Sequence, residues 1–224
     1  MHIASGMLSP PVWGTMAVVS GAALAGALVA ARKQADERRV PLMGVMGAFI
    51  FAAQMVNFSV PLVPGTSGHL GGGFLLGILL GPWLGMIAMA SILVVQALVF
   101  QDGGVEALGA NVFAMGVLPC LLGALVRGVW HGPRRRLAYA MTLAGGIVAV
   151  VAGSALVIVW LDCSHRIPAG VTFTQALSLM TVIHLAIGVV EGVVSVAVVR
   201  FVLASRPEAV WGDTALASAE EASA

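Results

Sequence analysis

The first two residues, Met1 and His2, carry three nitrogen atoms that could bind one metal ion together. These atoms are the free amine of Met1, the backbone nitrogen of His2 and the imidazole of His2. An initiator methionine is usually kept when a bulky residue follows it, so we expect the amine to belong to Met1 itself. Three nitrogens in one plane suit square-planar Ni(II), Cu(II) or low-spin Co(II), because imidazole and related donors favour these ions. The start of the chain therefore predicts a transition-metal site.

His69 is the candidate for a fourth nitrogen ligand, and its alternative role is that of a solvated loop residue. The segment around it contains five glycines, at positions 65, 68 and 71–73. Glycine lacks a Cβ and lets backbones approach closely, so the N-terminal segment could lie beside His69. If the His2 backbone nitrogen loses its proton on binding, the complex keeps one net positive charge, which lowers the cost of burying a dication. These ligands must be unprotonated to bind, so affinity should fall with pH.

A second group of polar residues could orient the two histidines. They lie at or near the expected outer ends of hydrophobic segments, together with Gln54. Polar groups in membrane-embedded helices usually face the bundle and bond each other, and simple helix-to-helix bonding is the alternative here. Hydrogen bonds to the second ring nitrogen of a ligating histidine orient it, and a nearby carboxylate can offset the remaining charge. We predict this outer-shell role for Asn57, Gln96, Gln101, Asp102 and Asn111.

The amino-acid composition indicates which kind of secondary structure must position these candidate ligands. The chain has 224 residues, of which 59% are hydrophobic and only 9% charged, and its mean hydropathy is +1.01. Soluble domains carry about 25% charged residues. The sequence therefore predicts an all-α integral membrane protein with its helices in one bundle. A helix needs about 20 apolar residues to cross a bilayer, and seven segments qualify or nearly qualify: 12–31, 41–60, 70–81, 83–100, 107–130, 137–160 and 174–204. The third is short and glycine-rich, which leaves six crossings as the alternative.

The basic residues favour seven crossings. Ten of the eleven then fall on one side of the membrane, and only Arg166 falls on the other. By the positive-inside rule the ten are cytoplasmic, so we expect the N-terminus outside and the C-terminus inside a plasma membrane. Residues 1–204 would form a single membrane domain. Residues 205–224 are rich in Ala, Ser and Glu and predict a disordered cytoplasmic tail.

Small residues recur every four positions, which lets helices pack closely in lipid. Internal packing is the ordinary interpretation of Gly73, Gly77, Gly81 and Gly85 and of Gly188 and Gly192. For Ala23, Ala27 and Ala31 we also consider a docking face for another membrane subunit.

His184 and Glu191 suggest a different class of function. They lie seven residues apart, hence on one helix face and about 10 Å apart. An intramembrane enzyme using this pair is one alternative, and a membrane assembly subunit without a ligand is another. No nucleophile accompanies the pair, and the sequence contains no Walker motif, so we expect no enzyme and no ATP hydrolysis by this chain.

Several motifs together resemble one family, the substrate-binding membrane subunit of cobalt and nickel energy-coupling-factor transporters, known as CbiM/NikM. The resemblance spans most of residues 1–204. It is carried by Met1-His2-Ile3 with Gly6, Gly65-Thr66-Ser67-Gly68-His69-Leu70-Gly71-Gly72, Leu80-Gly81-Pro82-Trp83, Val95-Gln96-Ala97-Leu98, Phe100-Gln101-Asp102-Gly103-Gly104, Leu108-Gly109-Ala110-Asn111, and the segment from His184 to Gly192.

The resemblance implies seven spans, an external N-terminus inserted into the bundle, and metal bound by Met1, His2 and His69. It implies that Co(II) or Ni(II) is the transported substrate, with no separate cofactor, for cobalamin synthesis or nickel enzymes. It also implies a transmembrane coupling subunit, cytoplasmic ATPase subunits and a small accessory membrane subunit as partners. The family start is often His-Ile-Pro, an acidic residue and Gly, whereas this chain has Ala4 and Ser5 at the middle positions.

Overall fold

The computed structural model describes residues 1–33 and 39–206, and these residues form a helical bundle. The helices are α1 (Pro10–Lys33), α2 (Arg39–Gln54), α3 (Gly73–Leu80), α4 (Pro82–Val95), α5 (Leu108–Val112), α6 (Leu118–Arg127), α7 (Arg135–Cys163) and α8 (Phe173–Ser205). A π-helical turn, Gln96–Phe100, continues α4, and another, Phe113–Val117, joins α5 to α6. A 3₁₀ turn, Gly128–His131, follows α6, and the short strands β1 (Phe58–Ser59) and β2 (Ser67–Gly68) pair antiparallel. The tail predicted over 205–224 lies outside the described residues from position 207 onward.

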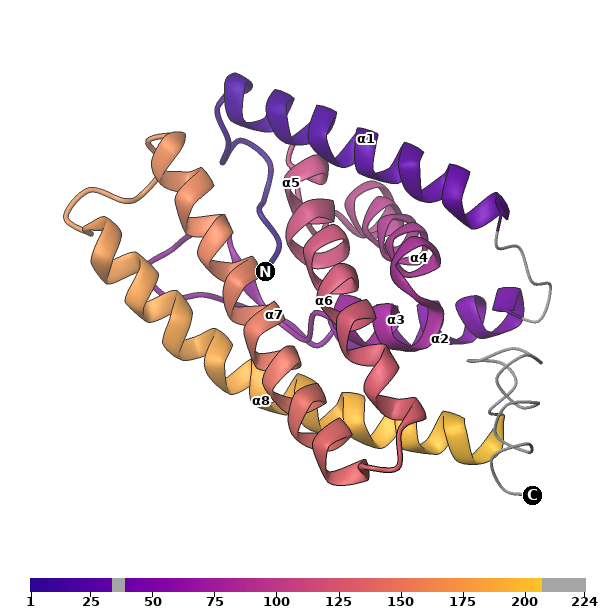
Figure 1. Ribbon diagram of the computed structural model, residues 1–224. Helices are drawn as coiled ribbons and strands as arrows, with labels where there is room; N and C mark the ends of the chain where they lie inside the picture. Colours follow the sequence, from indigo (N-terminus) through magenta and orange to yellow (C-terminus); the bar gives the residue numbers. More distant parts are fainter. Residues whose placement is uncertain (34–38, 207–224) are drawn as a thin grey trace, which may run out of the picture.

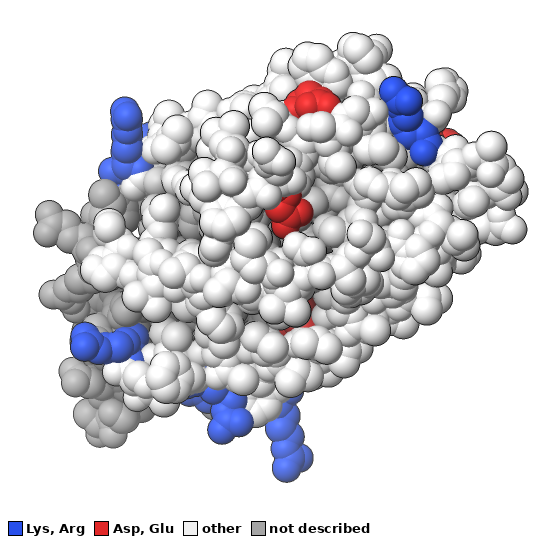
Figure 2. Space-filling view, turned by 180° about the vertical axis from the view of Figure 1, so that it is seen from behind, with Lys and Arg blue, Asp and Glu red and all other residues white. Residues whose placement is uncertain are grey.

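The prediction of an all-helical, multi-pass membrane protein is confirmed. Five helical stretches are long and apolar enough to cross a membrane: Pro10–Lys33, Pro82–Phe100, Leu108–His131, Arg135–Cys163 and Phe173–Ser205. The shorter apolar helix Val40–Gln54 adds to them, and α3 has eight residues, all buried. Each of the seven expected segments contains a helix, while the number of crossings and the orientation stay predictions. Figure 2 shows a face that is mostly uncharged, with Lys and Arg near its margins and a few Asp or Glu side chains within it.

Two segments differ from their expected bounds near the site. The expected helix over 41–60 ends at Gln54, after which β1 pairs with β2. The helix expected over 70–81 begins only at Gly73, because Gly72 has a left-handed φ of 80°. The residues left outside the helices, 55–72, form the irregular segment that carries His69. The last part of this segment, from Ser67 to Gly72, is buried or half-buried, and irregular backbone inside a membrane protein is tolerated where protein buries it.

Packing places α3 at the centre of the bundle. In Figure 1, α7 and α8 run side by side along one flank and α1 covers the opposite one, with α4, α5 and α6 between them. A Cβ on Gly73 or Gly77 would overlap the carbonyl oxygens of Met115 or Cys120, so these glycines allow α3 to touch the chain of α6 and the turn before it. Gly188 and Gly192 similarly face α7. The internal-packing interpretation of these glycines agrees with the structure.

The docking face suggested for α1 is wrong. Ala27 and Ala31 are buried, Ala27 completely, and Ala23 packs against the same core. α1 packs on α4 and α5 inside the chain. The small residues serve this internal contact and present no surface to another subunit.

Candidate metal site

The N-terminal segment enters the helical bundle. Figure 1 shows the N-terminus in the middle of the molecule, between α7 and the α5–α6 rod. Met1 and Ile3 are fully buried and His2 is 3% exposed. Ile3 pairs antiparallel with Thr66, and the Ala4 N–H donates to the carbonyl of Gly65 at 2.8 Å. The segment thus extends the short hairpin that follows α2.

The other edge of this segment is also hydrogen-bonded. The Gly104 N–H donates to the Ile3 carbonyl at 2.8 Å. Asn111 accepts from the Ile3 N–H at 2.9 Å and donates to the Ile3 carbonyl at 3.2 Å. A Cβ on Gly104 would lie 2.6 Å from the Ser5 nitrogen, so only glycine permits this approach. Buried backbone groups need such partners, and their presence allows a polar strand to lie inside an apolar bundle.

Three of the predicted ligands meet at the end of this segment. The Met1 amine nitrogen lies 2.9 Å from Nε2 of His69. The rings of His2 and His69 are stacked, with centroids 4.6 Å apart and planes at 30°. The His2 backbone N–H points to Ser67 Oγ at 3.1 Å. The Met1 amine and the rings of His2 and His69 therefore lie together in the buried core, although their segments are more than 60 residues apart in the sequence.

Hydrogen bonds leave one ring nitrogen of each histidine available. Nδ1 of His69 lies 2.7 Å from the Leu70 carbonyl, which can only accept, so this nitrogen carries the proton and Nε2 keeps its lone pair. Nε2 of His2 lies 3.1 Å from Oε1 of Gln96, an amide oxygen that also accepts. Nδ1 of His2 is buried with no hydrogen-bond partner among the described residues. It is the ring nitrogen that can share an ion with the amine and backbone nitrogen of the same chain end.

Burial keeps these nitrogens uncharged. Desolvation lowers the pKa of the Met1 amine from 8.0 to about 4 and that of His2 from 6.5 to about 3. Desolvation also lowers the pKa of His69 well below its usual value. At neutral pH all three groups are free bases, the form that a metal ion needs.

Four of the five predicted outer-shell residues lie at the site. Gln96 contacts His2, and Asp102 Oδ1 lies 3.3 Å from Nδ1 of His2, within reach of a charge contact but not in hydrogen-bond geometry. Asn57 donates to Asp102 at 3.0 Å, and Asn111 holds Ile3 as described above. Gln101 is different: it is exposed, at the left-handed residue that ends the π-helical turn. The structure does not bring it to the histidines.

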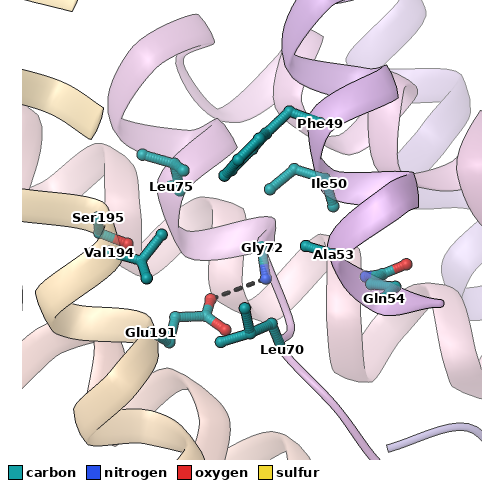
Figure 3. Close-up of a pocket in the computed structure, with 10 residues that line it drawn as sticks. All are labelled: Phe49, Ile50, Ala53, Gln54, Leu70, Gly72, Leu75, Glu191, Val194 and Ser195. Atoms are coloured by element: carbon teal, nitrogen blue, oxygen red, sulfur yellow. Dashed lines mark hydrogen bonds between the residues drawn. The ribbon is translucent and has the colours of Figure 1, made fainter. Parts of the chain in front are cut away.

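Two carboxylates have contacts that the sequence did not indicate. Glu106 accepts hydrogen bonds from the Gly6 N–H and from Ser5 Oγ at 3.2 Å, and the Gly6 contact lowers the pKa of Glu106. Its carboxylate thus reaches the stretch where this chain lacks the family's own acidic residue. Glu191 accepts from the N–H groups of Gly71 at 2.6 Å and Gly72 at 2.8 Å (Figure 3). No spacing rule links either carboxylate to its partner, because both contacts are tertiary.

His184 and Glu191 serve separate contacts. Nδ1 of His184 lies 2.9 Å from the Met180 carbonyl, within its own helix, and Glu191 binds the segment after His69. No group of three or more His, Cys, Asp or Glu side chains gathers anywhere in ranges 1–33 and 39–206. The candidate donors in this part of the chain therefore include the amine and backbone nitrogens as well as the two imidazoles.

Comparison with known proteins identifies the family. Residues 2–209 match the family described as the cobalt uptake substrate-specific transmembrane region, CbiM. The chain belongs to this family, as its motifs suggested.

Similar proteins include a provisionally named metal transport protein of Haloquadratum walsbyi, 38% identical over 94% of both chains. The fused nickel transport protein NikMN of Rhodobacter capsulatus is 32% identical over 93% of this chain and 63% of its own length. The crystal structure of a truncated transition metal transporter is 31% identical, with a TM-score of 0.79 over 91% of this chain and 98% of that one.

Proposed function

We propose that this protein captures Co(II) or Ni(II) at the outer face of the plasma membrane for import. The ion is the transported substrate, and the donors are the Met1 amine, the backbone nitrogen and Nδ1 of His2, and Nε2 of His69. The observation that carries the proposal is the 2.9 Å approach of the buried Met1 amine to His69 Nε2. Two nitrogen donors from distant segments are held side by side in the core, and nitrogen donors of this kind suit Co(II) and Ni(II).

The charge of the site fits a divalent ion with a deprotonated backbone nitrogen. That nitrogen supplies one negative charge, and Asp102 beside His2 supplies a second. Nitrogen donors disfavour Mg(II) and Ca(II), which prefer oxygen. The site therefore selects first-row transition ions over the abundant hard cations.

Import requires partners that this chain does not contain. The sequence has no nucleotide-binding motif, so ATP hydrolysis belongs to separate cytoplasmic subunits. We place the chain as the substrate-specific subunit of an energy-coupling-factor transporter, with a transmembrane coupling subunit, ATPase subunits and a small accessory membrane subunit. The fused architecture of the Rhodobacter capsulatus relative supports a further membrane segment working with this one.

The test compares the native N-terminus with a chain carrying two extra glycines before Met1. The extension converts the Met1 amine into an amide and leaves every side chain unchanged. Met1 is also fully buried, so the added residues do not fit beside it. We expect Ni(II) and Co(II) binding, measured by calorimetry on purified protein of verified N-terminal mass, to be lost. A matched control places the same two glycines after Arg206. Equal binding by the N-terminally extended protein would refute the chelate.

The same samples test the two other classes of function. An assembly subunit without a ligand would bind no metal even with the native N-terminus. An enzyme using His184 and Glu191 is disfavoured because their side chains are bonded to different elements.

A further inference from the structure

Glu191 is a carboxylate buried inside a membrane helix. It is 3% exposed, whereas the other described acidic residues lie in loops or at the end of α7. An intramembrane carboxylate is costly and persists only with hydrogen-bond partners or a function. Its partners here are two backbone N–H groups in the first residues after His69-Leu70. The contact joins the middle of α8 to the segment that carries a metal ligand.

Gly71 is held from both sides. Its N–H donates to Glu191 of α8 at 2.6 Å, and its carbonyl accepts from Nε2 of Gln54 of α2 at 2.5 Å. Gly72, next in the chain, donates to Glu191 in its left-handed conformation. Figure 3 shows the Glu191 side chain of α8 reaching the Gly72 N–H just before α3, with Gln54 at the end of α2. The peptide two residues after His69 is therefore fixed by two helices.

These contacts continue to the second histidine. Nε2 of Gln96 donates to Oε1 of Gln54 at 2.9 Å, and Oε1 of Gln96 lies 3.1 Å from His2. A continuous path of buried hydrogen bonds thus runs from His2 through Gln96, Gln54 and Gly71 to Glu191. Polar networks of this kind fix side-chain positions when every member has a partner.

We propose that Glu191 is the positioning residue for His69, and that its two hydrogen bonds to Gly71 and Gly72 hold Nε2 of His69 against the Met1 amine. The inference rests on the proposed metal-binding function and adds a link between that site and α8. We assign Glu191 no direct contact with the ion, because its contacts are to the backbone of Gly71 and Gly72, beyond the ligating His69. Any shift of α8 relative to this segment would displace one ligand from the other three.

A charge effect through space is the competing explanation, and a double-mutant cycle separates the two. The four proteins are wild type, Glu191→Gln, His69→Ala and the double variant, all with the native N-terminus. Cu(II) is the probe, because it binds nitrogen sites more tightly than Ni(II) or Co(II) and keeps the weakened variants measurable. Affinities are obtained by competition with a chelator of known strength.

Positioning predicts a strongly coupled cycle. Glutamine offers one acceptor oxygen and turns an N–H toward the second glycine amide, so Glu191→Gln should weaken binding roughly 10- to 100-fold, as loss of an outer-shell partner does. In the His69→Ala background the same change should have less than about a twofold effect, because the group that Glu191 positions is gone. Ser195→Ala is the matched control: Ser195 is buried one turn further along α8 without a hydrogen-bond partner among the described residues, and its loss should not change affinity.

Gly71→Ala tests the contact from the other side without altering charge. The added Cβ would lie 3.1 Å from Oε2 of Glu191 and must push the carboxylate away. We expect a partial loss of affinity that also disappears in the His69→Ala background. This variant decides the matter if Glu191→Gln does not elute as a folded monodisperse protein.

The outcomes separate this inference from the proposed function. Wild-type protein that binds no metal, or His69→Ala that binds as wild type, defeats the proposed function itself. If those two behave as expected, an equal effect of Glu191→Gln with and without His69 shows a charge effect and overturns the positioning role. Unchanged affinity in both Glu191→Gln and Gly71→Ala overturns it as well.

Discussion

Two histidine-containing regions of this bundle use their polar groups in opposite ways. At the N-terminus, the Met1 amine lies 2.9 Å from Nε2 of His69, and the His2 ring stacks on the His69 ring. In α8, His184 and Glu191 lie two turns apart on one helix, yet each is bonded to a different partner. The first region brings uncharged nitrogens from distant segments together, as a metal site requires. In the second, Nδ1 of His184 and both oxygens of Glu191 are bonded to the backbone, whereas Nε2 of His184 has no hydrogen-bond partner among the described residues.

The difference shows that proximity along the chain is a weak guide to a membrane site. Helical spacing places His184 and Glu191 on one face but cannot bring them closer than about 10 Å. The irregular segments can bring donors into contact, because glycines at Gly72 and Gly104 allow backbones to turn and approach. The candidate metal ligands lie in irregular segments, and side chains from the helices form the hydrogen bonds that position them.

The largest expected effect contrasts the two buried histidines. His69→Ala should weaken Ni(II) binding by at least about 100-fold, because losing a ligand must exceed the 10- to 100-fold cost of losing an outer-shell partner. His184→Ala should leave affinity unchanged, since its Nδ1 bonds within α8 and its Nε2 has no described partner. Calorimetry on both purified variants, with melting temperatures as a folding check, makes the comparison. Equal losses in the two proteins would mean that general packing damage, and not ligation, governs binding.

Much of the fold follows from the sequence because lipid imposes simple rules. Long apolar runs must be helical, so segments such as 137–160 and 174–204 predict α7 and α8 closely. Gln54 shows where the rule ends, since the apolar run continues past it but the chain leaves the helix to form β1. A hydropathy profile cannot predict where the backbone leaves a helix to form hydrogen bonds with another segment.

The sequence predicts the candidate metal-donor residues of the site but not the carboxylates that bind the backbone around them. Met1, His2 and His69 are identifiable because their chemistry is distinctive and glycines surround His69. Glu106 and Glu191 are not, since a carboxylate that binds backbone N–H groups has no preferred spacing from them. Gln101 shows the opposite error: it lies beside Asp102 in the sequence, but its left-handed backbone leaves it exposed.

An intermediate effect is expected from pH, and it distinguishes a buried chelate from an exposed one. Desolvation lowers the pKa of the Met1 amine to about 4 and of His2 to about 3, so neither holds a proton between pH 6 and 8. Metal binding then releases only one proton, from the His2 backbone N–H. The logarithm of the affinity should therefore rise by about one per pH unit. A free Met-His peptide, with its amine pKa near 8.0 and imidazole pKa near 6.5, should show a steeper slope below neutrality. A slope of two or more in the protein would show that the amine or imidazole is charged before binding.

The smallest effect should come from Glu106, which holds the N-terminal segment at its outer, solvated end. Its carboxylate accepts from the Gly6 N–H and from Ser5, four residues beyond the ligands. Glu106→Gln keeps one acceptor oxygen in a partly exposed contact, where such bonds contribute little, so affinity should fall about fivefold or less. Because those bonds lower the pKa of Glu106, its contribution is complete above the ordinary carboxyl range and is lost only in acid. The wild-type and Glu106→Gln proteins should therefore bind metal with the same slope between pH 6 and 8. Different slopes in that window would indicate that Glu106 acts on the ligands themselves and not on the segment that carries them.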